Sequence, residues 1–255
     1  MFGICNLSII AMRSQPSDAS EMLNQVLFGE HFSIIEKGNK WSKIKLYYDQ
    51  YTGYINNLQY IEIIESDYNA LCQSKKYYAG QFVNFITDNT SSITSIPLGA
   101  SLPFLKNNSL RISNRSFSYR GKVYNQTKTK SSVVKLAYLF LNVPYLWGGK
   151  SVFGIDCSGF TQTVYKLSGC NLLRDAKQQA TQGKTLGFIE ESEPGDLAFF
   201  DNQDGLISHV GIVLKSNYII HAHGKVRVDK LNHSGIYNLE TGKCSHKLKL
   251  IKRLL

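Results

Sequence analysis

The clearest pattern of hydrophobic and polar positions lies in the second half of the chain. Phe160, Val164 and Leu167 recur at the spacing of one helix face, and Gly169 follows as a typical helix stop. This pattern predicts an amphipathic helix that begins close to Cys157. A thiol at a helix N-terminus lies near unpaired backbone N–H groups and the positive end of the helix dipole, which both favour the thiolate. The pattern therefore places a cysteine where it can act as a nucleophile.

Alternating patterns follow downstream and predict strands. Residues 208–214 alternate, and residues 218–223 alternate again after a short polar break. Two such segments indicate a β-hairpin. A loop with an odd number of residues would place His209, His221 and His223 on one face of the sheet, whereas an even loop would separate His209 from His221. Opposed or diagonal side chains on one face lie within about 5–8 Å, so either His221 or His223 is a candidate partner for His209.

A further strand is indicated ahead of the hairpin, where the turn dipeptide Pro194-Gly195 leads into the apolar run 197–200. The second half of the chain therefore begins with helical patterns and continues with several consecutive strands. Helices and strands that segregate along the chain are typical of the α+β class. We predict an α+β fold, with helices packed on an antiparallel sheet.

The first half of the chain, residues 1–125, has no long helical period. Its short apolar or alternating runs lie close together, at residues 23–28, 32–35, 41–46 and 53–55. Closely spaced short strands indicate a small β-barrel. The polar segment 125–132 is interpreted as a linker, whose end supplies the N-cap of a helix over 133–141.

The neighbours of Cys157 argue for chemistry. The alternative is a buried cysteine that acts as a small hydrophobe, but such a cysteine usually has apolar neighbours, and Asp156 and Ser158 are polar. A thiol nucleophile needs a base, and the base needs an orienting partner. His209 is the candidate base. The histidines outside the hairpin are interpreted as structural or surface side chains: His31, His233 and His246.

The formal net charge is +10, which would suit an anionic wall fragment or a nucleic acid. The lysines are spread along the chain without a dense basic stripe, so we interpret the charge as solvated surface and expect no nucleic-acid partner. The cysteines show no C-x-x-C pairing, and His221 and His223 lack further ligands at suitable spacing. We therefore expect no metal and no cofactor.

At this point the second half resembles a known family, the NlpC-type cell-wall cysteine peptidases, which have a papain-like catalytic core. The resemblance covers residues 126–255 and rests on several motifs in the family's order. These are Pro144–Gly149, Asp156–Phe160, Arg174–Ala176, Pro194–Leu197, Ser208–Ile212 and Ile220–Ala222. The chain departs from the family at Leu173, where relatives often carry proline, and at Ala176, where some carry serine.

The resemblance implies roles for individual residues. Cys157 corresponds to the nucleophile, His209 to the general base and His221 to the polar residue that orients the base. The implied substrate-binding positions in this half are Tyr145, Trp147, Asp156, Ser158 and Arg174. The implied reaction is amide hydrolysis through a thioester.

Residues 1–66 resemble a bacterial SH3-like domain, and residues 67–125 resemble a second one more weakly. Two such domains before a catalytic domain resemble the subgroup of γ-D-glutamyl-L-diamino acid endopeptidases (dipeptidyl-peptidase VI). In this subgroup the first SH3-like domain admits only peptides with a free N-terminal L-alanine. Our candidates for contacting that ammonium group are Glu21 and Tyr54, with Asp156 from the catalytic side. The alternatives are a solvated carboxylate and a barrel aromatic.

The expected function is hydrolysis of the γ-D-glutamyl–diamino acid bond in free murein stem peptides, with release of L-Ala-γ-D-Glu. A wall-binding protein with a degenerate catalytic domain and a thioester-forming acyltransferase are the alternatives. We expect a monomer that acts on a small murein peptide and does not bind membranes, because no segment approaches transmembrane length. The first residues resemble no signal peptide, and an odd number of scattered cysteines suits a reducing compartment. The cytoplasm is therefore expected, or the periplasm if a signal peptide has been removed.

Overall fold

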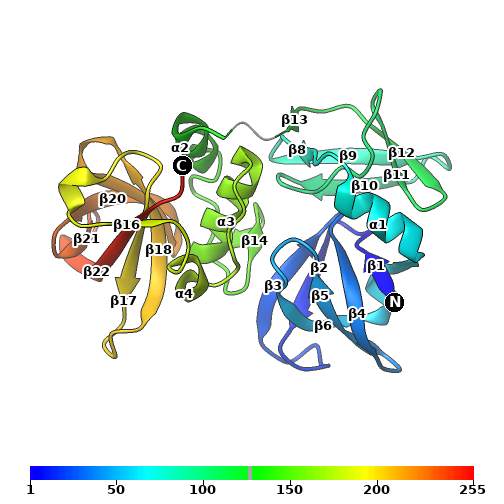
Figure 1. Ribbon diagram of the computed structural model, residues 1–255, viewed down its shortest axis with the longest axis horizontal. Helices are drawn as coiled ribbons and strands as arrows, with labels where there is room; N and C mark the ends of the chain where they lie inside the picture. The colour runs from blue at the N-terminus through cyan, green and yellow to red at the C-terminus, as the bar shows by residue number, and fades with distance from the viewer. Residues whose placement is uncertain (126–127) are drawn as a thin grey trace. The chain divides into compact units, whose positions relative to one another are not determined.

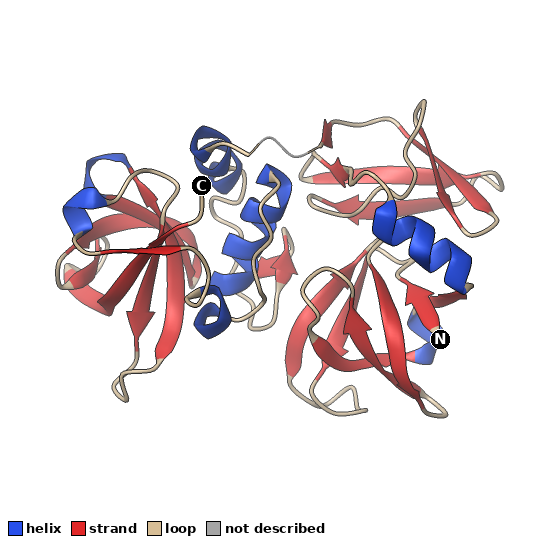
Figure 2. Ribbon diagram, in the orientation of Figure 1, coloured by secondary structure: helices blue, strands red, loops and turns tan. Residues whose placement is uncertain are grey.

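The computed structural model describes residues 1–125 and 128–255 of the chain. It divides into two compact units, Met1–Gln126 and Thr127–Leu255, which are shown in Figures 1 and 2. The predicted linker spans this boundary, and its residues 126–127 lie outside the described part. The linker supplies the N-cap of a helix, but three residues earlier than predicted: Thr129 accepts a hydrogen bond from the backbone N–H of Ser132, and the helix runs over Lys130–Tyr138 instead of 133–141.

A seven-stranded antiparallel sheet forms the first part of the first unit, in the order β3-β2-β6-β5-β4-β1-β7. Its strands are β1 (Phe2–Ile4), β2 (Ile9–Arg13), β3 (Met22–Leu27), β4 (His31–Lys37), β5 (Trp41–Leu46), β6 (Thr52–Asn56) and β7 (Ile61–Ile63). Alternate side chains such as Ile10, Met12, Ile44 and Ile55 are buried in one core. The short strands predicted from the alternation are therefore confirmed.

The rest of the first unit does not by itself confirm the second SH3-like domain that was predicted for residues 67–125, which stays a prediction. Helix α1 (Glu65–Gln73) follows a short η1 (Asn57–Gln59), and the remaining strands form a four-stranded sheet, β10-β9-β12-β11, and a separate β13-β8 pair. These strands are β8 (Tyr78–Ala79), β9 (Val83–Asp88), β10 (Ile93–Pro97), β11 (Ser109–Ile112), β12 (Arg115–Tyr119) and β13 (Val123–Tyr124).

Residues 67–125 share a core with the first part of the unit. Ile86 and Leu110 of the second sheet pack in one cluster with Ile4, Phe28 and Ile63 of the first part. The second sheet therefore buries its apolar face against the first part of the unit instead of closing on itself, since a sheet with one apolar face must cover that face. A second independent SH3-like domain is not confirmed.

The second unit is α+β, as predicted. Its helices are α2 (Lys130–Tyr138), α3 (Cys157–Ser168) and α4 (Ala176–Gln179), with single turns η2 (Ile189–Glu191) and η3 (Lys215–Asn217). Its strands are β14 (Lys150–Ser151), β15 (Gly154–Ile155), β16 (Lys184–Leu186), β17 (Leu197–Asp201), β18 (Ile207–Leu214), β19 (Tyr218–His223), β20 (Lys225–Asn232), β21 (Gly235–Asn238) and β22 (Lys243–Arg253).

The main sheet of the second unit closes on itself, which the sequence did not indicate. The strand order is β16-β22-β17-β18-β19-β20-β21, and β22 pairs with β21 as well. Strand β22 therefore joins β17 to β21, and each of these two would be an edge strand without it. Register shifts in its pairing with β21 and β17 bend this long strand into both partnerships. Phe200, Val213 and Ile236 are among the buried residues of the core that results.

Helix α3 begins and ends where the pattern predicted. The Asp156 side chain accepts from the backbone N–H of Gly159 at the N-terminus, and Gly169 ends the helix in the left-handed conformation with φ 89°. The prediction that the helix is amphipathic is wrong, because every residue from Cys157 to Ser168 is buried. Its polar residues are satisfied inside the unit, as when Thr161 Oγ1 donates to Gln179 Oε1 at 2.7 Å.

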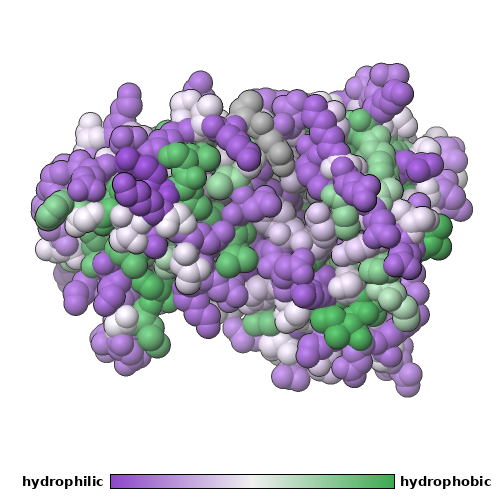
Figure 3. All heavy atoms as spheres, viewed as in Figure 1, coloured by the Kyte–Doolittle hydropathy of each residue, from purple (hydrophilic) through white to green (hydrophobic). Residues whose placement is uncertain are grey.

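Polar side chains cover most of the face shown in Figure 3, and apolar side chains interrupt them in small groups. In residues 1–125 and 128–255, the helices are all too short or too polar to cross a bilayer.

Candidate active site

The Cys157 thiol lies against the backbone of strand β18. Its Sγ is 4.0 Å from the carbonyl oxygen of Ser208, and the backbone N–H of Val210 faces the same sulfur. Ser208 and Val210 are the two neighbours of His209. The fold therefore brings the predicted nucleophile and the predicted base to the same point of the sheet, with helix α3 supplying one and β18 the other.

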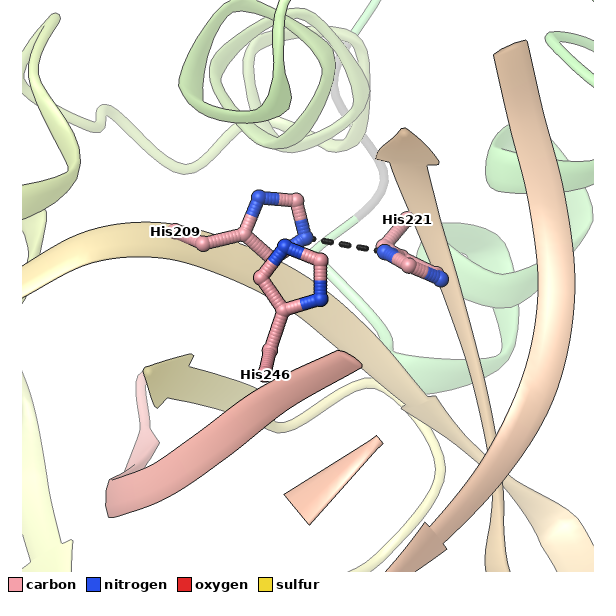
Figure 4. Close-up of side chains that lie close together, drawn as sticks. All are labelled: His209, His221 and His246. Carbon is pink, nitrogen blue, oxygen red and sulfur yellow. Dashed lines mark hydrogen bonds between the residues drawn. The ribbon is translucent and has the colours of Figure 1, made fainter. Parts of the chain in front are cut away.

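The hairpin has the register that places its histidines on one face. Gly211 pairs with His221 across β18 and β19, and the three residues of η3 form the connecting loop. The loop is therefore odd, as the argument required. His209 Nε2 lies 2.8 Å from His221 Nδ1, as the dashed line in Figure 4 shows. This decides the alternative that the sequence left open, because His221 is fully buried against His209 while His223 is exposed.

Two residues that the sequence analysis missed extend this contact into the neighbouring strand β20. His221 Nε2 lies 3.0 Å from Asp229 Oδ2, and Arg227 Nε donates to the same oxygen at 2.6 Å. Arg227 pairs directly with His221 in the register of β19 and β20. The sequence contained enough information to find both residues. If the hairpin register is extended to the next strand, Arg227 lies opposite His221, and Asp229 lies on the same face of that strand. Asp229 is fully buried.

The Asp229 carboxylate fixes which ring nitrogens carry protons. Burial raises its pKa, but hydrogen bonds from His221 and Arg227 outweigh this effect and hold the pKa below its usual range. An ionised carboxylate only accepts hydrogen bonds, so His221 Nε2 carries a proton and its Nδ1 accepts. His209 Nε2 must then donate to His221 Nδ1, which leaves the lone pair of His209 on Nδ1. In Figure 4 this Nδ1 points away from the other histidines.

Burial of the Cys157 thiol opposes the thiolate that a helix N-terminus favours. It is the main reason that the pKa of Cys157 is raised to about 12; the negative charge of Asp156 acts in the same direction, while the N–H groups of Val210 and Ser158 and the charge of Arg174 act in the opposite direction. Burial, followed by the charges of His221 and His246, holds the pKa of His209 well below 6.5. Desolvation thus acts against the helix N-terminus and favours a neutral thiol beside a neutral imidazole.

The predicted residues Asp156, Ser158 and Arg174 form one buried network next to Cys157. Arg174 Nη2 donates to Asp156 Oδ2 at 2.6 Å, and Arg174 Nη1 donates to Asp156 Oδ1 and Ser158 Oγ at 3.0 and 2.9 Å. Backbone N–H groups of Gly148 and Gly159 donate to the same carboxylate. The network fixes the loop before β14 to the start of helix α3.

Tyr145 and Trp147 lie on the segment that precedes this network. Burial raises the pKa of Tyr145 to about 12, and the charges of Cys157 and Asp156 contribute, so the phenol lies close to the nucleophile. The Tyr145 backbone N–H donates to Gly224 O, which ties the segment to the turn between β19 and β20. Trp147 is 62% exposed. An indole in this position can contact a bound ligand without rearrangement of the core.

Glu21 and Tyr54 belong to the first unit. Glu21 is exposed immediately before β3, and Tyr54 is partly buried in β6. Both flank the end of β2, where Arg13 pairs with Met22 on one side and with Tyr54 on the other. Contacts of Glu21 and Tyr54 with a substrate stay a prediction.

His246 is the other residue that the sequence analysis assigned to no site. It lies on β22 next to the register shift with β21, and its ring stacks on His209 with centroids 4.1 Å apart. A β-bulge re-aims side chains, so alternation within β22 gave no sign that this histidine faces the hairpin.

Comparisons with known proteins agree with this arrangement. Residues 142–243 match the NlpC/P60 family, and residues 12–58 match the bacterial dipeptidyl-peptidase SH3 domain. The γ-D-glutamyl-L-lysine dipeptidyl-peptidase of Bacillus subtilis is 38% identical over 102 residues, which are 39% of this chain and 34% of that protein. Two relatives match over most of the chain. The Bacillus cereus protein of the same name is 26% identical over 86% of this chain and 73% of its own length, and the dipeptidyl-peptidase 6 of Lysinibacillus sphaericus is 26% identical over 85% and 87%.

Solved structures share the fold. An NlpC/P60 family protein from Bacillus cereus superposes with a TM-score of 0.84 at 20% identity and covers 100% of both chains. An NlpC/P60 endopeptidase from Photobacterium damselae has a TM-score of 0.72 at 15% identity, covering 90% of this chain and 66% of that one. The chain therefore carries an NlpC/P60 cysteine peptidase domain, preceded by an SH3 domain of the bacterial dipeptidyl-peptidase type.

Proposed function

We propose that this protein is a cysteine endopeptidase that cuts the γ-D-glutamyl–diamino acid bond of free murein stem peptides and releases L-Ala-γ-D-Glu. The observation that carries the proposal is the hydrogen-bonded series His209, His221 and Asp229 beside the Cys157 thiol. The names of the relatives that match most of the chain support the same bond specificity.

The proposed reaction begins with proton transfer, because the resting thiol is neutral. His209 Nδ1 takes the proton of Cys157 as the sulfur attacks the γ-carbonyl carbon of D-glutamate. Backbone N–H groups at the start of α3, including that of Cys157, stabilise the tetrahedral oxyanion. Asp229, through His221, stabilises the imidazolium that forms on His209.

Collapse of the tetrahedral intermediate breaks the C–N bond. His209 returns its proton to the leaving amine of the diamino acid, and the γ-carboxyl carbon of D-glutamate stays on sulfur as a thioester. Water then loses a proton to His209 and attacks the thioester carbon, and the thiol leaves with that proton. The dipeptide departs with a new γ-carboxylate, and the site returns to a neutral thiol and a neutral imidazole.

We propose that the free ammonium of L-alanine is recognised beside Asp156 with help from Glu21 and Tyr54. Both Asp156 oxygens already accept from Arg174 and from backbone N–H groups, so the charge of this carboxylate is compensated. A desolvated ammonium needs a further negative charge, which Glu21 would supply. Tyr145, Trp147 and Ser158 would line the peptide, and Arg174 would hold Asp156 in place.

Mass spectrometry of the products tests this proposal. The full chain is incubated with L-Ala-γ-D-Glu-meso-diaminopimelate and with the same peptide acetylated on alanine, and Cys157→Ala is the inactive control. We expect the dipeptide from the free peptide alone. Equal rates on both peptides would refute the role of the ammonium, and an intact free peptide would refute the proposed bond.

The cytoplasmic location and the monomeric state stay predictions. Fractionation of the source cells checks the first, and sedimentation of the purified chain checks the second.

A further inference from the structure

We propose that His209, His221 and His246 bind a zinc ion, and that this ion reversibly switches the peptidase off. One ring nitrogen from each histidine lies within 4.8 Å of the other two. The rings come from β18, β19 and β22, and Figure 4 shows His209 and His221 joined by a hydrogen bond, with the ring of His246 against that of His209. This inference rests on the positions of three rings and is independent of the substrate proposed above.

Two of the three rings, His221 and His246, already have the outer contacts of metal-binding histidines. A ligating imidazole usually donates its other N–H to a carboxylate or another acceptor. His221 does so to Asp229 at 3.0 Å, which leaves Nδ1 for an ion. His246 Nδ1 lies 2.9 Å from Ser245 Oγ, which leaves Nε2 toward the cluster. His209 contributes Nε2, the atom that faces His221.

The spacing fits a small ion once the ring of His246, which now stacks on His209, turns its nitrogen toward the other two rings. Zn–N bonds of about 2.0–2.1 Å at a tetrahedral angle place two ligand nitrogens roughly 3.4 Å apart. The distance of 2.8 Å between His209 Nε2 and His221 Nδ1 must lengthen slightly. Any distance between two ligand nitrogens that exceeds the tetrahedral value, up to the limit of 4.8 Å, must shorten. His246 is only partly buried on a bulged strand, so its ring has room to move.

The donor chemistry selects the class of ion. Three neutral imidazoles suit zinc, copper and nickel, whereas calcium and magnesium require oxygen ligands. Three histidines and an open fourth position form a well-known type of zinc coordination. Asp229 adds a negative charge behind His221, which makes that imidazole a stronger donor.

Metal binding would remove the general base. In the resting site, His209 carries its proton on Nε2 and its lone pair on Nδ1. Zinc at Nε2 requires the lone pair there, so the proton moves to Nδ1 and the ring stays neutral. The nitrogen that must accept the Cys157 proton is then occupied. The same coordination breaks the hydrogen bond between His209 and His221, so one ion blocks the site in two ways.

Calorimetry with ZnCl₂ tests the site without relying on turnover. The full chain carries Cys157→Ala, so the thiol cannot hold the metal, and it is compared with Cys157→Ala/His246→Gln. The matched control is Cys157→Ala/His233→Gln, since His233 is exposed and is not one of the three clustered rings. Because losing even an outer partner weakens metal affinity by about 10–100-fold, we expect at least about tenfold weaker binding for His246→Gln and no change for His233→Gln.

The outcomes separate this site from binding at the thiol. Zinc bound equally by Cys157→Ala and Cys157→Ala/His246→Gln would overturn the proposal, as would binding that needs Cys157. Circular dichroism shows whether His246→Gln is folded, and His246→Asp, which restores a ligand, should recover part of the affinity. In the enzyme with its thiol, His246→Gln should raise the zinc concentration that halves the metal-free rate. If no peptide is cleaved, calorimetry still decides the question.

Discussion

Two buried aspartate–arginine pairs lie in the second unit, and their carboxylates have different partners. Asp156 accepts from Arg174, from the backbone N–H groups of Gly148 and Gly159 and from the Ser158 hydroxyl, and none of these donors is an imidazole. Asp229 accepts from Arg227 and from His221, whose proton can change position. The first carboxylate therefore fixes the backbone around the nucleophile, while the second determines the tautomer of the histidine that holds the base.

The two pairs differ because Asp229 has a histidine among its hydrogen-bond partners and Asp156 has none in the described residues. Both carboxylates are compensated by a guanidinium, so neither offers an unpaired charge. Only Asp229 has an imidazole between itself and the reacting atoms. We infer that loss of the pair between Asp156 and Arg174 will mainly lower the free energy of unfolding. A change at Asp229 will mainly lower kcat.

The largest expected effect is the loss of stability in Arg174→Met. This change leaves Asp156 buried without its guanidinium, and an uncompensated buried charge costs about 3–5 kcal/mol. Urea unfolding of the second unit measures the loss. The control is Glu190→Gln, which removes the carboxylate of an exposed contact with His233 in the same unit and should change unfolding little. A loss in Arg174→Met no greater than in this control would show that Asp156 does not depend on Arg174.

The second expected effect is on turnover in Asp229→Asn. The amide of asparagine can donate to His221 Nε2, which then carries its proton on Nδ1 and forces the proton of His209 onto Nδ1. The base is blocked, so we expect kcat to fall by about 100-fold or more with little change in KM. Steady-state kinetics measure the split, and ¹⁵N spectra of the histidines report the tautomers. An unchanged tautomer with an unchanged kcat would remove Asp229 from the mechanism.

The sequence predicted the parts of this site that depend on local pattern. The periodicity from Phe160 to Leu167 and the stop at Gly169 gave the bounds of α3, and the odd loop gave the register of His209 and His221. Local pattern suffices there because helix caps and hairpin register are fixed by neighbours in the chain.

The parts that were missed depend on distant contacts. The burial that raises the pKa of Cys157 arises in the folded unit, which no local pattern reports. His246 reaches His209 only because β22 closes the sheet through register shifts. The shared core of the first unit depends on Ile4 and Phe28 meeting a sheet more than 50 residues away in the sequence. The catalytic roles themselves stay predictions that the experiments above address.

The third expected effect is the pH dependence of kcat/KM in enzyme treated with a chelator. The base must be neutral to act, and its folded pKa lies below 6.5, so the rate should persist below pH 6.5 and fall about tenfold per pH unit only in more acidic solution. The thiol, with a pKa of about 12, should give no loss at mildly alkaline pH. A thiolate–imidazolium pair would instead lose activity when the imidazolium deprotonates, so an alkaline limb near pH ~8–9 would contradict the neutral resting pair.

The smallest expected effect concerns one hydroxyl of the fixed network. Ser158 Oγ accepts from Arg174 Nη1 at 2.9 Å and donates to Asp156 Oδ1 at 3.2 Å. Ser158→Ala removes both contacts but leaves the aspartate–arginine pair, so the unfolding free energy should fall by about 1 kcal/mol. If the network only fixes the backbone, the Asp229-dependent proton arrangement is unaffected, and the pH profile of kcat should keep its shape. A shifted profile would show that the two pairs act together, because the hydroxyl would then influence the protonation of His209.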